Sequence, residues 1–122
     1  MKPVSELTQL LAQMGPEIEG QLQPQLKRFF GAIIRGYLPQ TWVFQTEQGT
    51  ASLLVSKTGS VEATEGAALN PDVTVQWSHA QLTAALKTRD RSQVPPGPPP
   101  ETIFHTGKGK TAFNFLRSRL GL

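Results

Sequence analysis

The sequence predicts a single domain that contains both helices and strands, and three observations lead to this prediction. The chain has 122 residues, a usual size for one domain, so we assign residues 1–122 to it. Apolar residues recur every three or four positions near both ends of the chain, as they do on one face of a helix. Between residues 42 and 64 they alternate with polar residues, as they do in strands with one buried face.

Two helices are predicted before the strands. The first follows Pro3 and ends at Gly15-Pro16, which interrupts the helical pattern. The second is predicted to begin near Pro24, because the first position of a helix needs no backbone N–H. Its wide apolar face must be buried against another part of the protein. That face consists of Leu26, Phe29, Phe30, Ile33, Ile34 and Tyr37.

Three strands are predicted next, at residues 42–47, 51–57 and 60–64. The dipeptides Gln48-Gly49 and Thr58-Gly59 mark tight turns between them. The three strands therefore form an antiparallel meander.

A fourth strand, Val73–Trp77, leads directly into a helix. It follows a turn at residues 70–72, whose Asn-Pro-Asp sequence is typical of turns. Ser78 is a good N-cap, and Gln81, three residues later, can reach back to it as in a capping box. The strand and the helix are thus predicted to be joined without a loop.

The last third of the chain contains a proline-rich segment, a short strand and a terminal helix. Residues 94–100 include five prolines, and we interpret them as a stiff surface connection; a docking ligand for an aromatic groove is the alternative. A strand is predicted at residues 101–106, and the terminal helix is predicted to start at Lys110 or Thr111. The apolar side of this helix comprises Ala112, Phe113, Phe115, Leu116 and Leu120.

The sequence offers no constellation of catalytic or metal-binding residues. The absence of cysteine excludes disulfides, thiol catalysis and zinc–thiolate sites. The two histidines, His79 and His105, have no partner at metal-ligand spacing. The Gly107–Thr111 stretch resembles the end of a phosphate-binding loop, but Phe104 occupies the position of the required upstream glycine. We therefore predict a protein that is not an enzyme and needs no metal or cofactor.

Positive charge is concentrated towards the C-terminus. From Lys87 onward seven cations face two acids, a net charge of +5, whereas residues 1–86 carry −2. This excess is modest, and no motif that stacks aromatic side chains on bases accompanies it, so we expect no nucleic acid partner. The same charge is compatible with transient contact with an anionic membrane surface. No apolar run reaches the ~18 residues that span a bilayer, and no signal-peptide core follows Met1, so a cytoplasmic protein is expected.

The stretch Asp72–Leu82, DVTVQWSHAQL, resembles the sterol carrier protein 2 family of nonspecific lipid-transfer proteins. It is similar to the family's Asp-x-Thr-hydrophobic strand followed by a serine and a helix with a central leucine. The meander at residues 42–66 and the Gly107-Lys108 turn before a terminal amphipathic helix are also similar in order and spacing. The chain departs from the pattern where the proline-rich segment replaces a glycine turn, and where Gly107 and Gly109 stand only two apart.

This resemblance implies an α+β domain with a five-stranded, mostly antiparallel sheet covered by helices. It further implies a hydrophobic tunnel that takes sterols, fatty acids or acyl chains, and neither a metal nor a catalytic residue. We therefore expect non-catalytic lipid binding or transfer, with the tunnel between the sheet and the second and terminal helices. Lys108 and Lys110 are candidates for binding an acidic headgroup. The candidate tunnel residues, for which core packing is the alternative role, are Phe30, Ile33, Leu53, Val55, Trp77, Leu82, Phe113, Leu116 and Leu120.

Three other functions are compatible with the sequence. A domain with a filled core could act as a scaffold through the proline-rich segment or through a homodimer face. The basic C-terminal third could bind an anion or nucleic acid. The domain could also work beside a lipid-metabolising enzyme. The size of the cavity distinguishes the scaffold from the lipid carrier.

Overall fold

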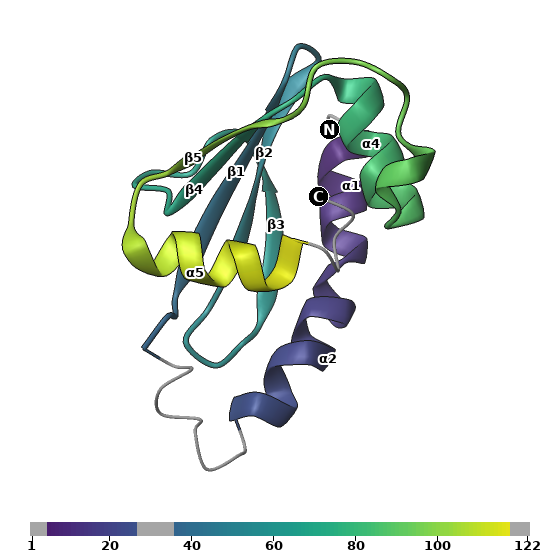
Figure 1. Ribbon diagram of the computed structural model, residues 1–122. Coiled ribbons are helices and arrows are strands. Elements are labelled where there is room, and N and C mark those ends of the chain that lie inside the picture. The colour runs from purple at the N-terminus through teal and green to yellow at the C-terminus, as the bar shows by residue number, and fades with distance from the viewer. Residues whose placement is uncertain (1–4, 27–35, 118–122) are drawn as a thin grey trace.

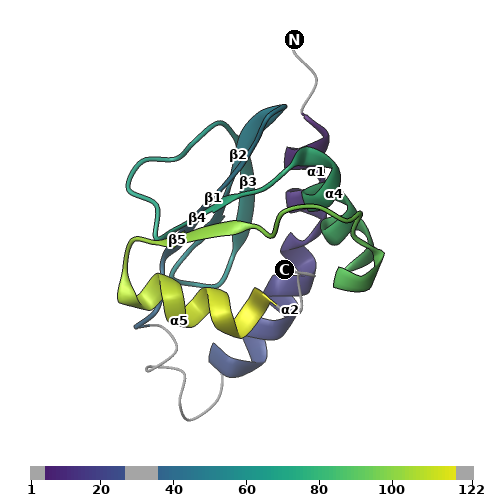
Figure 2. The same ribbon diagram turned by 45° about the horizontal axis from the view of Figure 1, so that its top comes forward.

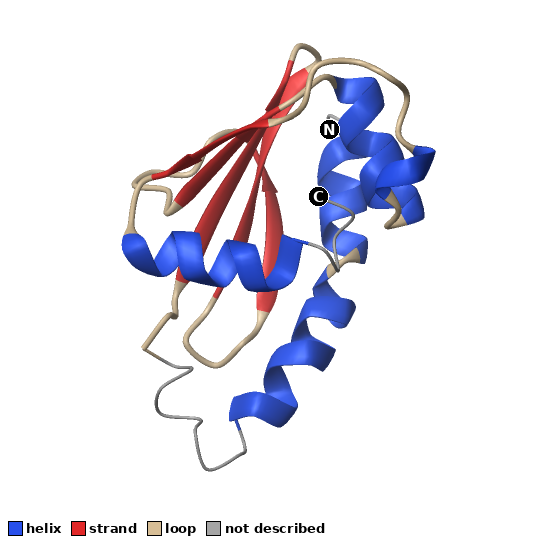
Figure 3. Cartoon of the chain, viewed as in Figure 1, coloured by secondary structure: helices blue, strands red, loops and turns tan. Residues whose placement is uncertain are grey.

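The computed structural model describes residues 5–26 and 36–117, which form a five-stranded sheet with helices on one side (Figures 1 and 3). The strand order is β3-β2-β1-β4-β5; β1 and β4 are parallel, and the other neighbours are antiparallel. The predicted α+β fold and meander are thus confirmed. The strands are β1 (Gln40–Thr46), β2 (Gly49–Val55), β3 (Val61–Glu65), β4 (Val73–Gln76) and β5 (Glu101–Phe104). The helices are α1 (Glu6–Gln13), α2 (Gly15–Leu26), α4 (His79–Thr88) and α5 (Gly107–Leu116), with a 3₁₀ turn at Arg91–Gln93.

The helices divide the covered face of the sheet between them. Helix α1 packs on β2 and β3, α2 packs on β3, and α5 packs on β4 and β5. Alternation along the strands points Trp42 and Phe44 of β1 and Leu53 of β2 into the core, where each is at most 1 % exposed. Within the described residues, no helix is long and apolar enough to cross a membrane.

The second helix begins nine residues earlier than predicted. It starts at Gly15, with Pro16 in its first turn, and Pro24 lies inside it. A proline in the first turn removes no intrahelical hydrogen bond, so Gly15-Pro16 both ends α1 and starts α2. Ile18 and Leu22, both buried, continue the apolar row of Met14 at steps of four residues.

The rest of the predicted second helix can be followed only in part. Residues 27–35, which include Phe29, Phe30, Ile33 and Ile34, lie outside the described residues. Tyr37 was predicted on the apolar face of this helix, but it lies in a turn just before β1. The prediction continued the three- and four-residue spacing of the helix as far as Tyr37, although Gly36 and Tyr37 form a turn.

The strand-to-helix junction agrees with the prediction. Ser78 caps α4 by accepting a hydrogen bond from the Gln81 N–H at 3.2 Å, and its hydroxyl donates to Gln81 Oε1 at 2.7 Å. The two side chains are therefore hydrogen-bonded to each other, and the Ser78 hydroxyl also pairs with a backbone N–H at the start of the helix.

The proline-rich segment returns from α4 to β5 (Figure 2). It packs against the chain's own Trp77. The Pro98 carbonyl accepts hydrogen bonds from Trp77 Nε1 at 3.0 Å and from Gln81 Nε2 at 3.2 Å. The Arg91 guanidinium lies 5.0 Å from the centre of the Trp77 ring, within the range of a cation–π contact. These contacts fix the path of the segment.

A carboxylate on β3 anchors the start of α1. Glu65 Oε1 accepts hydrogen bonds from the Ser5 N–H at 2.7 Å and from the Thr8 hydroxyl at 2.6 Å. The hydrogen bonds from Ser5 and then from Thr8 hold the pKa of the Glu65 carboxyl below its ordinary value of 4.5.

We expect this anchor to make the stability of the protein sensitive to acid. Folding lowers the pKa of Glu65, so its carboxylate contributes its full share to the free energy of unfolding above pH 4.5. This stabilisation is lost as the pH falls through the lower pKa of the folded state. In Glu65→Gln the free energy of unfolding should therefore fall less steeply with acid than in the wild type. Denaturant unfolding between pH 3 and pH 7 measures this, with Glu62→Gln on the same strand as the control. Equal acid dependence in wild type and Glu65→Gln would contradict the expectation.

Candidate ligand-binding cavity

A cavity of about 220 Å³ lies between α5, the second half of α2 and the ends of β1 and β2. The elements that supply its lining, α5, α2, β1 and β2, are labelled in Figure 1. Its lining is mostly apolar, and no charged side chain among the described residues takes part in it. The lining residues are Leu22, Tyr37, Leu38, Gln40, Trp42, Val55, Thr111, Ala112, Phe115 and Leu116.

Three aromatic rings support one wall of the cavity. The Trp42 and Phe113 rings meet edge to face with their centres 5.2 Å apart, and Phe104 meets Phe113 at 6.0 Å. Trp42 and Phe113 are at most 1 % exposed. Because such pairs are close-packed and rigid, this wall is preformed.

Polar groups at the cavity are largely engaged with the protein itself. Trp42 Nε1 donates to Gln40 Oε1 at 2.9 Å, and Gln40 Nε2 donates to the Tyr37 carbonyl at 2.5 Å. The Thr111 hydroxyl donates to the Gly107 carbonyl of its own helix at 3.2 Å. The cavity therefore offers an apolar ligand a surface with few unpaired polar atoms.

Helix α5, which forms one side of the cavity, is held at its N-terminus by Asp72. The Asp72 carboxylate accepts hydrogen bonds from the Thr106 hydroxyl at 2.8 Å and from the Thr41 N–H at 2.9 Å. Thr106 in turn caps the helix, since its hydroxyl oxygen accepts from the Gly109 N–H at 3.0 Å. One carboxylate thus links β1, β4 and the cap of α5.

The terminal helix starts at Gly107 rather than at Lys110 or Thr111, so that prediction was wrong. The Gly-Lys-Gly-Lys stretch is the first turn of the helix and not a turn before it. A glycine is needed at position 109, because a Cβ atom there would lie 2.6 Å from the Asp72 carbonyl oxygen. The glycines that suggested a turn instead allow the helix to approach the sheet.

Two of the nine predicted tunnel residues, Val55 and Leu116, line the cavity. Phe113 lies behind it, against Trp42. Leu53, Trp77 and Leu82 are buried in the core cluster, but they do not line the cavity. The remaining three, Phe30, Ile33 and Leu120, lie outside the described residues.

Several lining residues were absent from the prediction. Leu22 was missed because the start of α2 was misplaced, and Gln40 because the first strand was predicted to begin two residues later. Trp42 could have been found, since it occupies an inward position of β1 beside Leu53, its partner in the ladder. Ala112 and Phe115 were on the predicted apolar side of the terminal helix, although they were not chosen as ligand residues.

The two candidate headgroup lysines lie on α5, outside the cavity lining. Lys108 Nζ donates to the Pro39 carbonyl at 2.9 Å, which places its charge beside the residue that precedes Gln40. Lys110 is exposed. An acidic headgroup could therefore meet Lys108 only outside the apolar lining.

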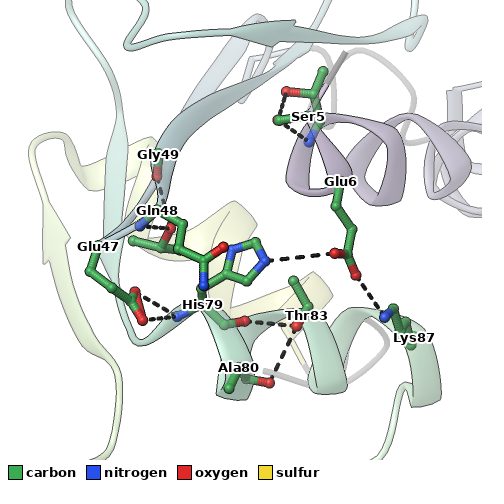
Figure 4. Close-up of polar contacts among 11 residues, drawn as sticks. Ser5, Glu6, Glu47, Gln48, Gly49, His79, Ala80, Thr83 and Lys87 are labelled. Carbon is green, nitrogen blue, oxygen red and sulfur yellow. Dashed lines mark hydrogen bonds and ion pairs between the residues drawn. The ribbon is translucent and has the colours of Figure 1, made fainter. Parts of the chain in front are cut away.

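A second polar cluster joins α1 to α4 (Figure 4). Glu6 accepts from Lys87 Nζ at 2.6 Å and lies 3.8 Å from His79 Nε2, and the Glu47 carboxylate accepts from the His79 N–H. The hydrogen bond and charge of Lys87 lower the pKa of the Glu6 carboxyl. The arrangement connects two helices and the β1–β2 turn. Within residues 5–26 and 36–117, no group of three or more acids or histidines could hold a metal ion.

The sheet order, the helices on one face and the terminal helix beside an apolar cavity define a sterol-carrier-like fold. Comparison with one solved structure confirms this fold. The chain is similar to a structure described as "UbiJ-SCP2 Ubiquinone synthesis protein", with a TM-score of 0.51 and 15% identity over 96% of this chain and 93% of that one. It is also similar to Sterol Carrier Protein 2 from Yarrowia lipolytica (apo form), with a TM-score of 0.39 and 11% identity over 93% and 89%. No family model and no curated protein matches the sequence.

Proposed function

We propose that this protein binds the apolar part of a lipid in the cavity beside α5 and catalyses no reaction. The observation that carries the proposal is an apolar cavity of about 220 Å³ whose described lining residues include none with a charge. An apolar cavity of about 150 Å³ can hold a benzene ring, whereas pockets for whole drug-sized ligands begin at about 300 Å³. The cavity is therefore of a size to enclose part of a lipid chain.

The energetics favour such a ligand. Each methylene group buried from water contributes ~0.8 kcal/mol, so partial enclosure of a chain supplies useful affinity. The preformed aromatic wall adds to this because little of the protein has to be ordered on binding. The cavity also argues against the filled-core scaffold, which would leave no such space.

The class of lipid is best approached with several probes. The resemblance suggests sterols, fatty acids and acyl chains, and the described function of one structural neighbour adds an isoprenoid quinone. Lipid exchange would use brief contact of α5 with a membrane surface, since Phe115 is 50 % exposed and lies at the cavity.

The decisive experiment is extraction of the purified protein with organic solvent, followed by mass spectrometry of the extract. A displacement assay with a fluorescent fatty acid then ranks a fatty acid, a sterol and an isoprenoid quinone. We expect a co-purifying lipid and saturable binding at micromolar probe. Absence of both would refute the proposal.

Lys108 is expected to discriminate between acidic and neutral lipids. Lys108→Ala should weaken the binding of a fatty acid about two- to fivefold, the effect of a partly exposed ion pair, and leave a neutral sterol unchanged. The displacement assay measures both, and the effect on the fatty acid should diminish at high salt. Lys87→Ala on α4 removes the same charge away from the cavity and serves as the control. An equal loss for the sterol would count against a headgroup role.

A further inference from the structure

Among the described residues that line the cavity, Gln40 has the most deeply buried amide or hydroxyl side chain. It is 2 % exposed and forms, with Val55, the last residue pair of the β1–β2 ladder. Its amide makes one hydrogen bond through each end, accepting from Trp42 Nε1 and donating to the Tyr37 carbonyl. These two bonds also fix the orientation of the amide, because the indole N–H can only donate and the carbonyl can only accept.

The Gln40 amide can form more hydrogen bonds than these two. A glutamine side chain carries two N–H groups and two lone pairs on oxygen. Among the described residues, one N–H and one lone pair of Gln40 therefore have no partner. Both amide atoms are already hydrogen-bonded, and the second N–H and the second lone pair can bind a polar group of a ligand.

The surroundings determine which ligand group can do so. No described residue of the lining carries a charge. A carboxylate or phosphate at this depth would therefore lose its hydration and gain no counter-ion in its place. A neutral hydroxyl group can both donate to the free lone pair and accept from the free N–H. A carbonyl group can accept from the N–H.

We propose that Gln40 is the specificity-determining residue of the cavity and that it selects neutral lipids carrying a hydroxyl or carbonyl group. This inference rests on the proposed function and names the ligand class of the same site. The polar group enters first and binds the Gln40 amide, and the apolar part extends between Trp42 and Leu116. Lipids with a charged headgroup enter tail first and do not use Gln40.

The test compares two probes of equal length, dodecanol and dodecane, as competitors of a fluorescent fatty acid. The ratio of their affinities is the measured quantity, because a general change in the cavity affects both probes alike. Gln40→Met keeps the length of the side chain and removes the amide. Gln45→Met makes the same change on β1 at a residue that does not line the cavity, and is the control.

We expect Gln40→Met to reduce the preference for dodecanol over dodecane about three- to tenfold, the usual worth of one or two buried hydrogen bonds, and Gln45→Met to leave it unchanged. Because Gln40→Met also removes the acceptor of Trp42 Nε1, a second measurement uses the wild type. In nuclear magnetic resonance spectra, dodecanol should shift the side-chain amide signals of Gln40 well beyond the shift that dodecane causes by filling the same cavity.

Two results would overturn the inference while sparing the proposed function: an unchanged ratio in folded Gln40→Met, or Gln40 amide signals that shift no further with bound dodecanol than with bound dodecane. If neither dodecanol nor dodecane binds to the wild type, both this inference and the proposed function are wrong.

Discussion

Gly109→Ala is expected to destabilise the protein by about 1–3 kcal/mol, the usual cost of forcing an extra methyl group into a packed site. The new Cβ atom would lie 2.6 Å from the carbonyl oxygen of Asp72 and 2.9 Å from its Cβ atom. The closest of these is a backbone atom of the residue that precedes β4, and it cannot rotate away as a side chain can, so α5 has to move. Movement of α5 loosens the Thr106 cap and opens the cavity. Denaturant unfolding measures the first effect, and fluorescent fatty acid binding measures the second.

Gly107→Ala is the matched control, two residues earlier in the same helical turn. A Cβ atom at this position meets nothing within 4 Å. Alanine is a better helix former than glycine, so we expect stability to be unchanged or to rise by about 0.5 kcal/mol. If both variants were equally destabilised, the contact with Asp72 would not explain the glycine at position 109.

Ala112→Phe should abolish most lipid binding while the protein stays folded. Ala112 lines the cavity from α5, and a benzyl group would occupy space meant for a ligand chain. Each displaced methylene group costs the ligand ~0.8 kcal/mol, so the loss of two or three weakens binding about ten- to fiftyfold. The added apolar contacts replace those of the ligand, so the melting temperature should not fall. Fatty acid titration and thermal unfolding of the same samples separate the two effects.

Ala80→Phe introduces the same side chain on α4, at an exposed position that does not line the cavity. It should bind lipid as the wild type does. Unchanged binding in Ala112→Phe would show that the ligand lies elsewhere, and an equal loss in both variants would point to a general effect of an added aromatic ring.

Local patterns in the sequence were sufficient to predict most of the fold. The meander follows from alternation between tight turns, and the junction at Ser78 follows from a cap that depends only on residues 78 and 81. The errors occurred where distant contacts decide the structure. Gly109 indicates a turn by itself, but its neighbour across the fold, Asp72, makes it part of a helix. Pro24 favours a helix start by itself, but the row of Met14, Ile18 and Leu22 already belongs to a helix buried against the sheet.

The cavity was less predictable than the fold for a related reason. An apolar side chain that lines a cavity and one that fills a core look alike in a sequence, as Leu53 and Val55 on the same strand demonstrate. Only the packing of α5 and α2 decides which of them borders empty space. Gln40 is different, because a polar residue at an inward position just before Trp42 is a signal that alternation could have identified.

The chain contains two tryptophans, and their positions give it two independent optical sensors. Trp42 borders the cavity, so its emission responds to whether the space beside it is dry, wet or filled. Trp77 lies beneath the proline-rich segment with Arg91 over its ring, so its emission responds to release of that segment. Single-tryptophan proteins made with Trp77→Phe and Trp42→Phe would let uptake of a ligand and movement of the segment be timed separately, without an attached dye.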